Sequence, residues 1–322
     1  MTHSLPPFLT IEPKCQGETL PLVTRFLHSE KLGNTEAHTL WWPCASEEPV
    51  AVILFIPGNP GLIEFYRGFL SAIHDQTKDE IAILAHAHLG HASHIPPPPE
   101  QFLGLTPQVE GALEAYDTVK AMYPAAKMVL IGHSIGAWIS TKVLQYRPET
   151  VEATFLLFPT LSEIAQSPNG RRLSRLFRPP FPRFISAISP ACWFIPTGLL
   201  ACLFSDWPEQ QITVLETLIG SPATVFASLT MAGEEMLQLR ELDAAFIQQH
   251  RAKLWIYYAE KDDWIAEEQA KVEKAMEDPN LSGTGDHITH CRHGVPHSFP
   301  LNHGPLLGAH CVNWLQACGI LD

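Results

Sequence analysis

The sequence predicts a doubly wound α/β fold: a mostly parallel sheet with helices on both faces and an inserted helical, hydrophobic lid. Three observations predict it. Predominantly apolar runs recur along the chain, stretches with helical periodicity lie between them, and residues 159–250 interrupt this alternation with mixed helical and apolar sequence. Continuous apolar runs suit strands covered on both faces, and strands that alternate with helices specify a parallel sheet.

The predicted strands of the parallel sheet are the apolar runs themselves. They are VAVILFI (50–56), IAILAHA (81–87), KMVLIG (127–132), VEATFLLF (151–158) and AKLWIYY (252–258). The earlier segments LPLVTRFL and HTLWW are predicted to be antiparallel strands that lead into the sheet, and HITHCRH to be its last strand.

Helical patterns fill the intervals between these runs. EFYRGFLSAIHDQ follows the first run, a second helix is predicted to begin at Ser134, and the final helix is predicted from Pro305 to Cys318. Between Pro107 and Tyr123, six residues recur at the spacing of one helix face: Val109, Ala112, Leu113, Tyr116, Val119 and Met122.

The domain organisation follows from this order of elements. Residues 1–158 and 251–322 are predicted to form the core, and residues 159–250 to form a lid inserted between two core strands. In folds of this class, binding sites lie at the carboxyl ends of the strands.

Charge and cysteine content restrict the partners and the compartment. The 21 basic and 34 acidic residues give a formal net charge of −13 at pH 7, which disfavours binding to nucleic acid. Seven irregularly spaced cysteines indicate buried thiols in a reducing compartment. The N-terminal sequence MTHSLPPFLTIEPKCQG lacks the basic and apolar regions of a secretory signal, so we expect the protein to face the cytosol.

A serine between two glycines is the strongest candidate for a nucleophile. In Gly132-His133-Ser134-Ile135-Gly136, Ser134 follows the strand KMVLIG and precedes the helix IGAWISTKVLQY. That strand–turn–helix setting is typical of a nucleophile elbow, whose sharp turn brings backbone segments too close for a Cβ at Gly132 and Gly136.

An activated serine needs a base and an acid, which should follow it in the order Ser, acid, His. Asp262 is the predicted acid, with Asp263 as the alternative, because both lie in a loop after strand 252–258. A solvated acidic turn that caps the next helix is the competing interpretation. Six histidines follow this loop: His287, His290, His293, His297, His303 and His310.

His297 is the predicted base because GVPHSFPLNHG lies between the last strand and the final helix. His303 could instead begin that helix, and His287 and His290 would fall on the strand. Two backbone N–H groups are predicted to form an oxyanion hole, one from Ile135 and one from the loop PGNPG. Because Pro60 has no N–H, Asn59 is the expected second donor and Gly61 the alternative.

Four histidines occur together in HAHLGHASH: His86, His88, His91 and His94. Their spacing suits zinc, but the hydrolytic motif H-x-H-x-D-H has an aspartate where this chain has Gly90. No carboxylate occurs between Glu80 and Glu100. We therefore predict a polar loop at the rim of the active site, with no metal.

An arginine-rich and then apolar segment, 171–205, lies inside the predicted lid. Its arginines are Arg171, Arg172, Arg175, Arg178 and Arg183. The uncharged stretch 184–205 has the length of a membrane span, but Pro190 and Pro196 favour a bent, interfacial or re-entrant segment. A hydrophobic lid over an acyl site is the competing interpretation.

Taken together, FIPGNPGLIEFY, LIGHSIGAW, YYAEKDDW, GVPHSF and HAHLGHASH resemble the lipid droplet-associated hydrolase family of the α/β-hydrolase superfamily, over about residues 50–315. The resemblance implies an α/β-hydrolase fold and a triad of Ser134, Asp262 and His297. It also implies lipid esters, sterol esters among them, as substrates, and a location at a lipid droplet or the cytosolic face of the endoplasmic reticulum. There the arginines of 171–205 would lie near the lipid surface and the apolar stretch with Trp193 would insert. The reaction requires no cofactor. The alternative is a protein that binds or organises a lipid surface with little or no turnover.

Overall fold

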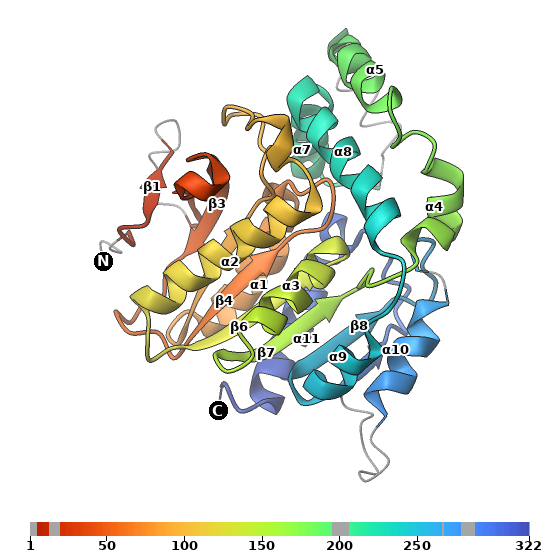
Figure 1. Ribbon diagram of the computed structural model, residues 1–322. Helices are drawn as coiled ribbons and strands as arrows, with labels where there is room; N and C mark the ends of the chain where they lie inside the picture. Colours follow the sequence, from red (N-terminus) through yellow and green to blue (C-terminus); the bar gives the residue numbers. More distant parts are fainter. Residues whose placement is uncertain (1–4, 13–19, 195–205, 266, 278–286, 322) are drawn as a thin grey trace.

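The computed structural model describes residues 5–12, 20–194, 206–265, 267–277 and 287–321 (Figure 1). Within these residues, one sheet of nine strands has the order β1-β2-β3-β5-β4-β6-β7-β8-β9. The strands are β1 (Leu9–Ile11), β2 (Leu22–Leu27), β3 (Glu36–Trp42), β4 (Ala51–Ile56), β5 (Ile81–His86), β6 (Lys127–His133), β7 (Val151–Leu157), β8 (Leu254–Tyr258) and β9 (Ile288–His290).

The strand directions confirm the predicted architecture. β1, β2, β3 and β5 pair in antiparallel fashion, and every pairing from β5 through β4, β6, β7 and β8 to β9 is parallel. The two predicted antiparallel lead-in strands are β2 and β3. The sequence does not predict β1, because a strand of three residues is too short to show a periodic pattern.

The helices of the described residues include the four that the sequence predicts individually, and most of the others lie in the insertion. They are α1 (Arg67–Thr77), α2 (Leu105–Met122), α3 (Ile135–Tyr146), α4 (Pro168–Leu173), α5 (Phe181–Ile188), α7 (Glu209–Ile219), α8 (Pro222–Gln238), α9 (Ala244–His250), α10 (Glu268–Met276) and α11 (Gly304–Ala317). Short 3-10 turns include η2 (Ile63–Tyr66), η4 (Ile164–Gln166), η5 (Ser189–Phe194) and η8 (Phe299–Leu301).

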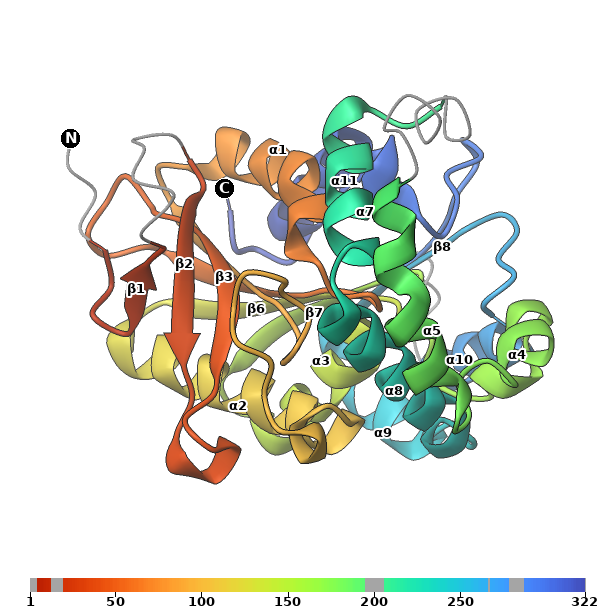
Figure 2. The ribbon, with the colours of Figure 1, turned by 90° about the horizontal axis from the view of Figure 1, so that it is seen from above.

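Helices cover both faces of the sheet, as Figure 2 shows from above. α1 and α11 pack together on one face, and α2, α3, α9 and α10 lie on the other. The sequence of β4 is apolar throughout because both of its faces are covered. Val52 and Leu54 join one core cluster, while Ile53 and Phe55 join the other. All four side chains are completely buried. Burial of each such side chain contributes roughly 1.5–3 kcal/mol.

The segment between β7 and β8 carries helices α4, α5, α7, α8 and α9. Figure 1 shows α5, α7 and α8 beyond the carboxyl ends of the central strands. Helix α9 lies differently, because it packs against α10 and its Phe246 and Ile247 join the core cluster on that face of the sheet. Helix α9, the last part of the predicted insertion (159–250), therefore belongs to the layer of helices that covers the core sheet.

Among the described residues, no single helix is both long and apolar enough to cross a bilayer. One pair of helices, α7 and α8, passes the test of length and composition when taken together, and it is bent by 88° at its junction. Part of the predicted lipid-contact segment 171–205, namely residues 195–205, lies outside the described residues, as does the side chain of Trp193.

Candidate active site

Ser134 lies at the sharp turn between β6 and α3. Its backbone angles, φ 54° and ψ −121°, are unusual for a residue with a side chain and cost on the order of 1–3 kcal/mol. The surrounding backbone holds this conformation, because the Ser134 N–H donates to Leu157 O (3.0 Å) and the Ser134 carbonyl accepts from the N–H of Ala137 (3.0 Å). The turn thereby presents the hydroxyl at the carboxyl end of the sheet.

The two glycines of the pentapeptide are required by close backbone contacts. A Cβ on Gly136 would lie 2.3 Å from Ile56 O and 2.4 Å from Pro57 O. A Cβ on Gly132 would lie 2.4 Å from Gly136 O. Helix α3 therefore packs directly against the end of β4, the strand that precedes the loop PGNPG.

The structure brings Ser134, His297 and Asp262 into one hydrogen-bonded series. Ser134 Oγ lies 2.9 Å from His297 Nε2, and His297 Nδ1 lies 2.7 Å from Asp262 Oδ2. Because a carboxylate only accepts hydrogen bonds, Nδ1 carries the proton and Nε2 is free to accept the serine proton. The Asp262 side chain is 5% exposed, and its Oδ1 also accepts from the Trp264 N–H at 2.9 Å.

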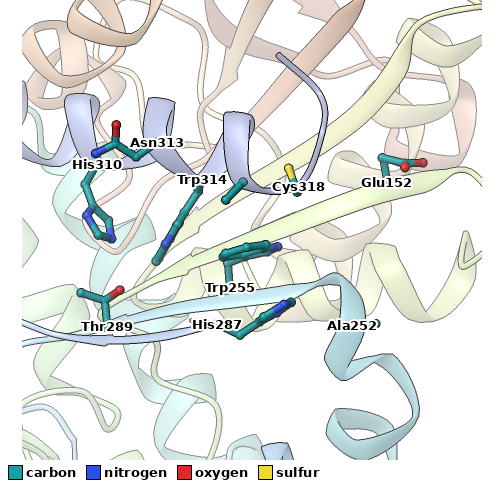
Figure 3. Close-up of a pocket in the computed structure, with 10 residues that line it drawn as sticks. Glu152, Ala252, Trp255, His287, Thr289, His310, Asn313, Trp314 and Cys318 are labelled. Carbon is teal, nitrogen blue, oxygen red and sulfur yellow. The ribbon is translucent and has the colours of Figure 1, made fainter. Parts of the chain in front are cut away.

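The alternative residues lie elsewhere. Asp263 is exposed next to Asp262, and His303 occupies the N-cap position of α11. His290 is in β9, stacked on Tyr258. His287 stacks on Trp255, with ring centroids 4.0 Å apart, in a separate pocket of about 700 Å³ beneath α11 (Figure 3). This pocket shares no lining residue with the cavity at Ser134.

The two predicted oxyanion donors flank Ser134. Ile135 is the first residue of α3. The loop PGNPG passes close by, since a Cβ on Gly58 would lie 3.1 Å from Ser134 Cβ. Asn59 lines the same cavity as Ser134, whereas a Cβ on Gly61 would meet the ring of His88 at 2.6 Å. Within the loop PGNPG, Asn59 therefore lies on the side of Ser134, and Gly61 lies against the loop HAHLGHASH.

A buried hydrogen-bonded chain, which the sequence does not predict, supports the loops around Ser134. The Gly58 N–H donates to the Tyr66 hydroxyl (3.0 Å), which lies 2.8 Å from His133 Nδ1. His133 Nε2 in turn lies 2.9 Å from the backbone carbonyl of His297. A carbonyl only accepts, so Nε2 carries the proton and Nδ1 accepts from Tyr66. The chain joins the loop PGNPG, the serine turn and the loop that carries His297.

Burial keeps His133 in this neutral form. The side chain is 5% exposed, and its ring packs against Phe158 and Phe299. Loss of solvation lowers the pKa of His133 well below its usual value, and the neighbouring His297 lowers it further. The only sign in the sequence that His133 links these loops is its place directly before the predicted nucleophile.

The prediction of a polar loop at the rim is wrong for three histidines of HAHLGHASH. His86, His88 and His91 are at most 5% exposed, and burial lowers the pKa of each. His88 Nε2 donates to Pro57 O at 2.9 Å, so this loop lies beneath PGNPG. Within the described residues, no group of three or more His, Cys, Asp or Glu side chains is placed to hold a metal ion.

Ser134 and His297 line a cavity of about 590 Å³ between the core and the helices of the insertion. Most of the lining is apolar, and the insertion supplies the larger share of the apolar residues. Representative lining residues are Leu173, Phe177, Leu215, Leu218, Leu229 and Met236. The wall therefore suits a long apolar group next to the serine hydroxyl.

One carboxyl group lies in this apolar wall. Glu235 of α8 is 4% exposed and accepts from Asn59 Nδ2 at 2.8 Å. Burial raises the pKa of Glu235 to about 7, and the Asn59 hydrogen bond partly opposes that rise. The side chain is thus the principal titratable group that the insertion contributes to the described part of the cavity.

A family model described as lipid-droplet associated hydrolase matches residues 49–300 of the chain. Proteins named lipid droplet-associated hydrolase are similar over most of their length. The protein from Gallus gallus is 30% identical, with 83% of this chain and 85% of that protein covered. The protein from Homo sapiens is 29% identical (79% and 81% covered), and that from Drosophila melanogaster is 26% identical (82% and 93% covered).

Solved structures share the fold at low sequence identity. A 2-hydroxy-6-oxo-6-phenylhexa-2,4-dienoate hydrolase from Rhodococcus superposes with a TM-score of 0.65 at 13% identity, covering 92% of this chain and 99% of that one. A haloalkane dehalogenase from Agrobacterium tumefaciens gives a TM-score of 0.62 at 17% identity, with 92% and 97% covered. These similarities identify the α/β-hydrolase fold.

Proposed function

The chain belongs to the lipid droplet-associated hydrolase family, and on that premise we propose that it hydrolyses carboxylic esters of lipids with Ser134 as nucleophile. One observation carries the proposal: the hydrogen-bonded series of Ser134, His297 and Asp262 lies beside an apolar cavity. A serine hydroxyl becomes an effective nucleophile when a histidine takes its proton and a carboxylate orients that histidine.

In the proposed acylation step, Ser134 Oγ attacks the ester carbonyl carbon while its proton passes to His297 Nε2. Asp262 stabilises the resulting imidazolium through its hydrogen bond with Nδ1. The tetrahedral intermediate then collapses, the bond to the alkoxy oxygen breaks, and that oxygen takes the proton from Nε2 and leaves as the alcohol. Water, deprotonated by His297, hydrolyses the acyl-enzyme and restores the serine hydroxyl. These steps need no cofactor.

We assign the stabilisation of the tetrahedral oxyanion to the backbone N–H groups of Asn59 and Ile135. Ile135 begins α3, so its N–H lies at the positive end of the helix dipole. Loss of one such donor typically lowers kcat by about 10²–10³. Asn59 lines the same cavity as Ser134 and lies in the loop after β4.

The apolar cavity favours the acyl chain of a lipid ester, with sterol esters among the candidate substrates. We assign the lid role to residues 159–250, whose helices supply most of the apolar wall. The mostly apolar lining disfavours a peptide substrate, because a peptide backbone would bring polar groups that this wall largely leaves without partners.

We assign lipid-surface contact, at a lipid droplet or the cytosolic face of the endoplasmic reticulum, to the segment 171–205. Its described part includes three exposed apolar side chains of α5: Phe181 (44% exposed), Phe184 (61%) and Ile188 (51%). Four exposed arginines precede them: Arg171, Arg172, Arg175 and Arg178. Each arginine near an anionic lipid surface contributes about 1 kcal/mol to binding, and the apolar side chains add their burial in the interface.

The test is hydrolysis of a series of esters with increasing acyl length, presented with phospholipid-coated oil droplets. We expect the native protein to release fatty acid, with kcat/KM rising with chain length until the cavity is filled, and Ser134→Ala to release none above background. A well-folded native protein with no turnover of any ester in the series would contradict the proposal and support the alternative of a lipid-surface binding protein.

A further inference from the structure

Glu235 is a buried carboxyl group that the proposed reaction does not use. It lies on α8, the insertion helix nearest to the loop PGNPG, and it lines the cavity at Ser134. A buried carboxyl in an apolar wall is costly unless it has a partner. Its partner here is the side-chain amide of Asn59, on the core side of the cavity.

Within the part of the chain that the structure describes, α8 supplies both hydrogen-bond partners of the Asn59 side-chain nitrogen. Asn59 Nδ2 donates to Glu235 Oε1 at 2.8 Å and to the Ser228 backbone carbonyl at 2.9 Å. An amide nitrogen has two hydrogens, so both donors are used. Because Ser228 and Glu235 lie about two turns apart on α8, they present their acceptors on the same face of the helix.

Core residues form hydrogen bonds with the two residues before Asn59. Pro57 accepts through its carbonyl from His88 Nε2, and the Gly58 N–H donates to Tyr66. Both of these partners belong to the core. The hydrogen bonds of the Asn59 side chain, by contrast, go to the insertion.

We propose that Glu235 is a positioning residue that fixes Asn59, and through it the backbone N–H assigned to the oxyanion, so that the oxyanion hole is complete only when α8 is seated. The inference rests on the proposed function, because it concerns a donor for that reaction. It makes the insertion part of the catalytic geometry as well as a cover for the apolar substrate.

The protonation of Glu235 allows a matched pair of variants. The causes that shift its pKa are burial and the Asn59 hydrogen bond, and the groups on Asn59 and Ser228 that face it are neutral. Below about pH 7 the side chain therefore keeps its proton. A glutamine at this position has the same shape and offers Asn59 the same acceptor oxygen, whereas a leucine keeps the volume and removes the acceptor.

The experiment compares Glu235→Gln and Glu235→Leu in the full-length protein at pH 6, with a soluble short-chain ester as substrate. We expect Glu235→Gln to keep kcat within about threefold of the native value. We expect Glu235→Leu to lower kcat about 10- to 100-fold with KM within about threefold, because a donor to the transition state is misplaced. Glu234→Leu is the matched control. It removes a carboxylate of the same helix that accepts from the Leu105 N–H at 2.7 Å, and we expect kcat within about threefold.

Hydrogen exchange of the peptide that contains residues 58–62 is a second readout that does not depend on turnover. We expect faster exchange there in Glu235→Leu and native exchange in Glu235→Gln. Unchanged kcat and exchange in a folded Glu235→Leu protein would overturn the inference, as would equal losses in both variants. If the native protein hydrolyses no ester while exchange follows the expected pattern, the proposed function fails and the positioning of Asn59 by Glu235 stands.

Discussion

The two walls of the Ser134 cavity are built in different ways. The core wall carries polar groups joined by hydrogen bonds of 2.7–3.0 Å, which run from Asp262 through His297 to Ser134 and from Gly58 through Tyr66 to His133, beside apolar side chains such as Phe65 and Leu301. The wall from the insertion is mostly apolar, with Ser228 and one carboxyl group, Glu235. We therefore assign the catalytic steps to the core. We assign the selection of the substrate and the control of its access to the insertion.

The difference follows from how each wall is positioned. The polar groups of the core wall lie at the ends of parallel strands or in the loops that follow them, and parallel strands bring their carboxyl ends to one edge of the sheet. Hydrogen bonds within the core then hold these groups in place. The insertion has no such frame. Its contacts with the core near the cavity include apolar packing, hydrogen bonds of two buried carboxyl groups, Glu235 and Glu268, and the Gln211 amide, which donates to Phe65 O and Pro300 O.

The largest expected effect separates the two acidic residues of the core wall. Asp262→Asn should lower kcat about 10³- to 10⁴-fold with little change in KM, because an amide at this position favours the wrong tautomer of His297. Asp263→Asn, at an exposed neighbouring carboxylate, should leave kcat within about threefold. Steady-state kinetics on a short-chain ester provide the measurement. Equal losses in the two variants would contradict the assignment of Asp262 as the orienting acid.

A smaller effect concerns the carboxyl group that anchors the start of the insertion. Glu268 is 1% exposed and accepts from the N–H groups of Leu161 (3.0 Å) and Ser162 (2.5 Å). Burial raises the pKa of Glu268 to about 7, against the opposing effect of these hydrogen bonds. Between the ordinary carboxyl pKa and about 7, the folded protein thus keeps a proton that the unfolded chain has lost.

The free energy of unfolding should therefore fall as pH rises through that window, since the folded state binds more protons there. Glu268 and Glu235 should each contribute up to about 3 kcal/mol to this fall. Glu268→Gln removes one of the two contributions, so the difference in unfolding free energy between pH 5 and pH 8 should shrink by up to that amount. Denaturant titrations at both pH values check this, and an unchanged difference would show that Glu268 ionises normally in the folded state.

The hydrogen-bonded chain behind the serine provides the third test. Tyr66→Phe removes the acceptor of the Gly58 N–H and the donor to His133 Nδ1, and it leaves both groups buried without a partner. We expect kcat to fall about tenfold and the unfolding free energy to fall by about 1–3 kcal/mol. The measurements are kcat, KM and chemical denaturation. A loss of stability without a change in kcat would show that these hydrogen bonds stabilise the fold and do not affect catalysis.

The smallest expected effect concerns the outer surface of the insertion. Phe184→Ser removes one exposed aromatic ring of α5, and the affinity for vesicles that contain anionic phospholipid should fall about tenfold. Hydrolysis of a soluble ester should be unchanged. Tyr146→Ser is the control, because Tyr146 is 60% exposed at the end of the core helix α3. Equal affinity losses in a sedimentation assay would contradict the assignment of α5 to the lipid surface.

The sequence predicts the core better than it predicts the insertion. Residue types at strand ends were sufficient to select Ser134, His297 and Asp262 as a set, because the order of strands and helices determines which loops meet. Spacing cannot separate Asp262 from Asp263, since adjacent residues differ in side-chain direction rather than in position along the chain. The hydrogen bond to His297 Nδ1 makes that distinction.

Features that depend on packing between distant segments are those that the sequence does not predict. The histidines of HAHLGHASH look polar in sequence, but the loop folds beneath PGNPG and the rings of His86, His88 and His91 are buried. The interval between β7 and β8 shows no regular alternation, so nothing in its sequence separates the core helix α9 from α8. The contact between Asn59 and Glu235 likewise joins residues that are far apart in the chain.

The most direct test of the account is labelling by a fluorophosphonate probe, followed by identification of the modified peptide. Native protein, Ser134→Ala and His297→Ala would be compared in the presence of phospholipid-coated droplets, with circular dichroism to verify folding. The account predicts a single modified site at Ser134 in the native protein and no labelling in either variant. A folded native protein that remains unlabelled, or labelling that persists in Ser134→Ala, would contradict the claim that Ser134 is an activated nucleophile.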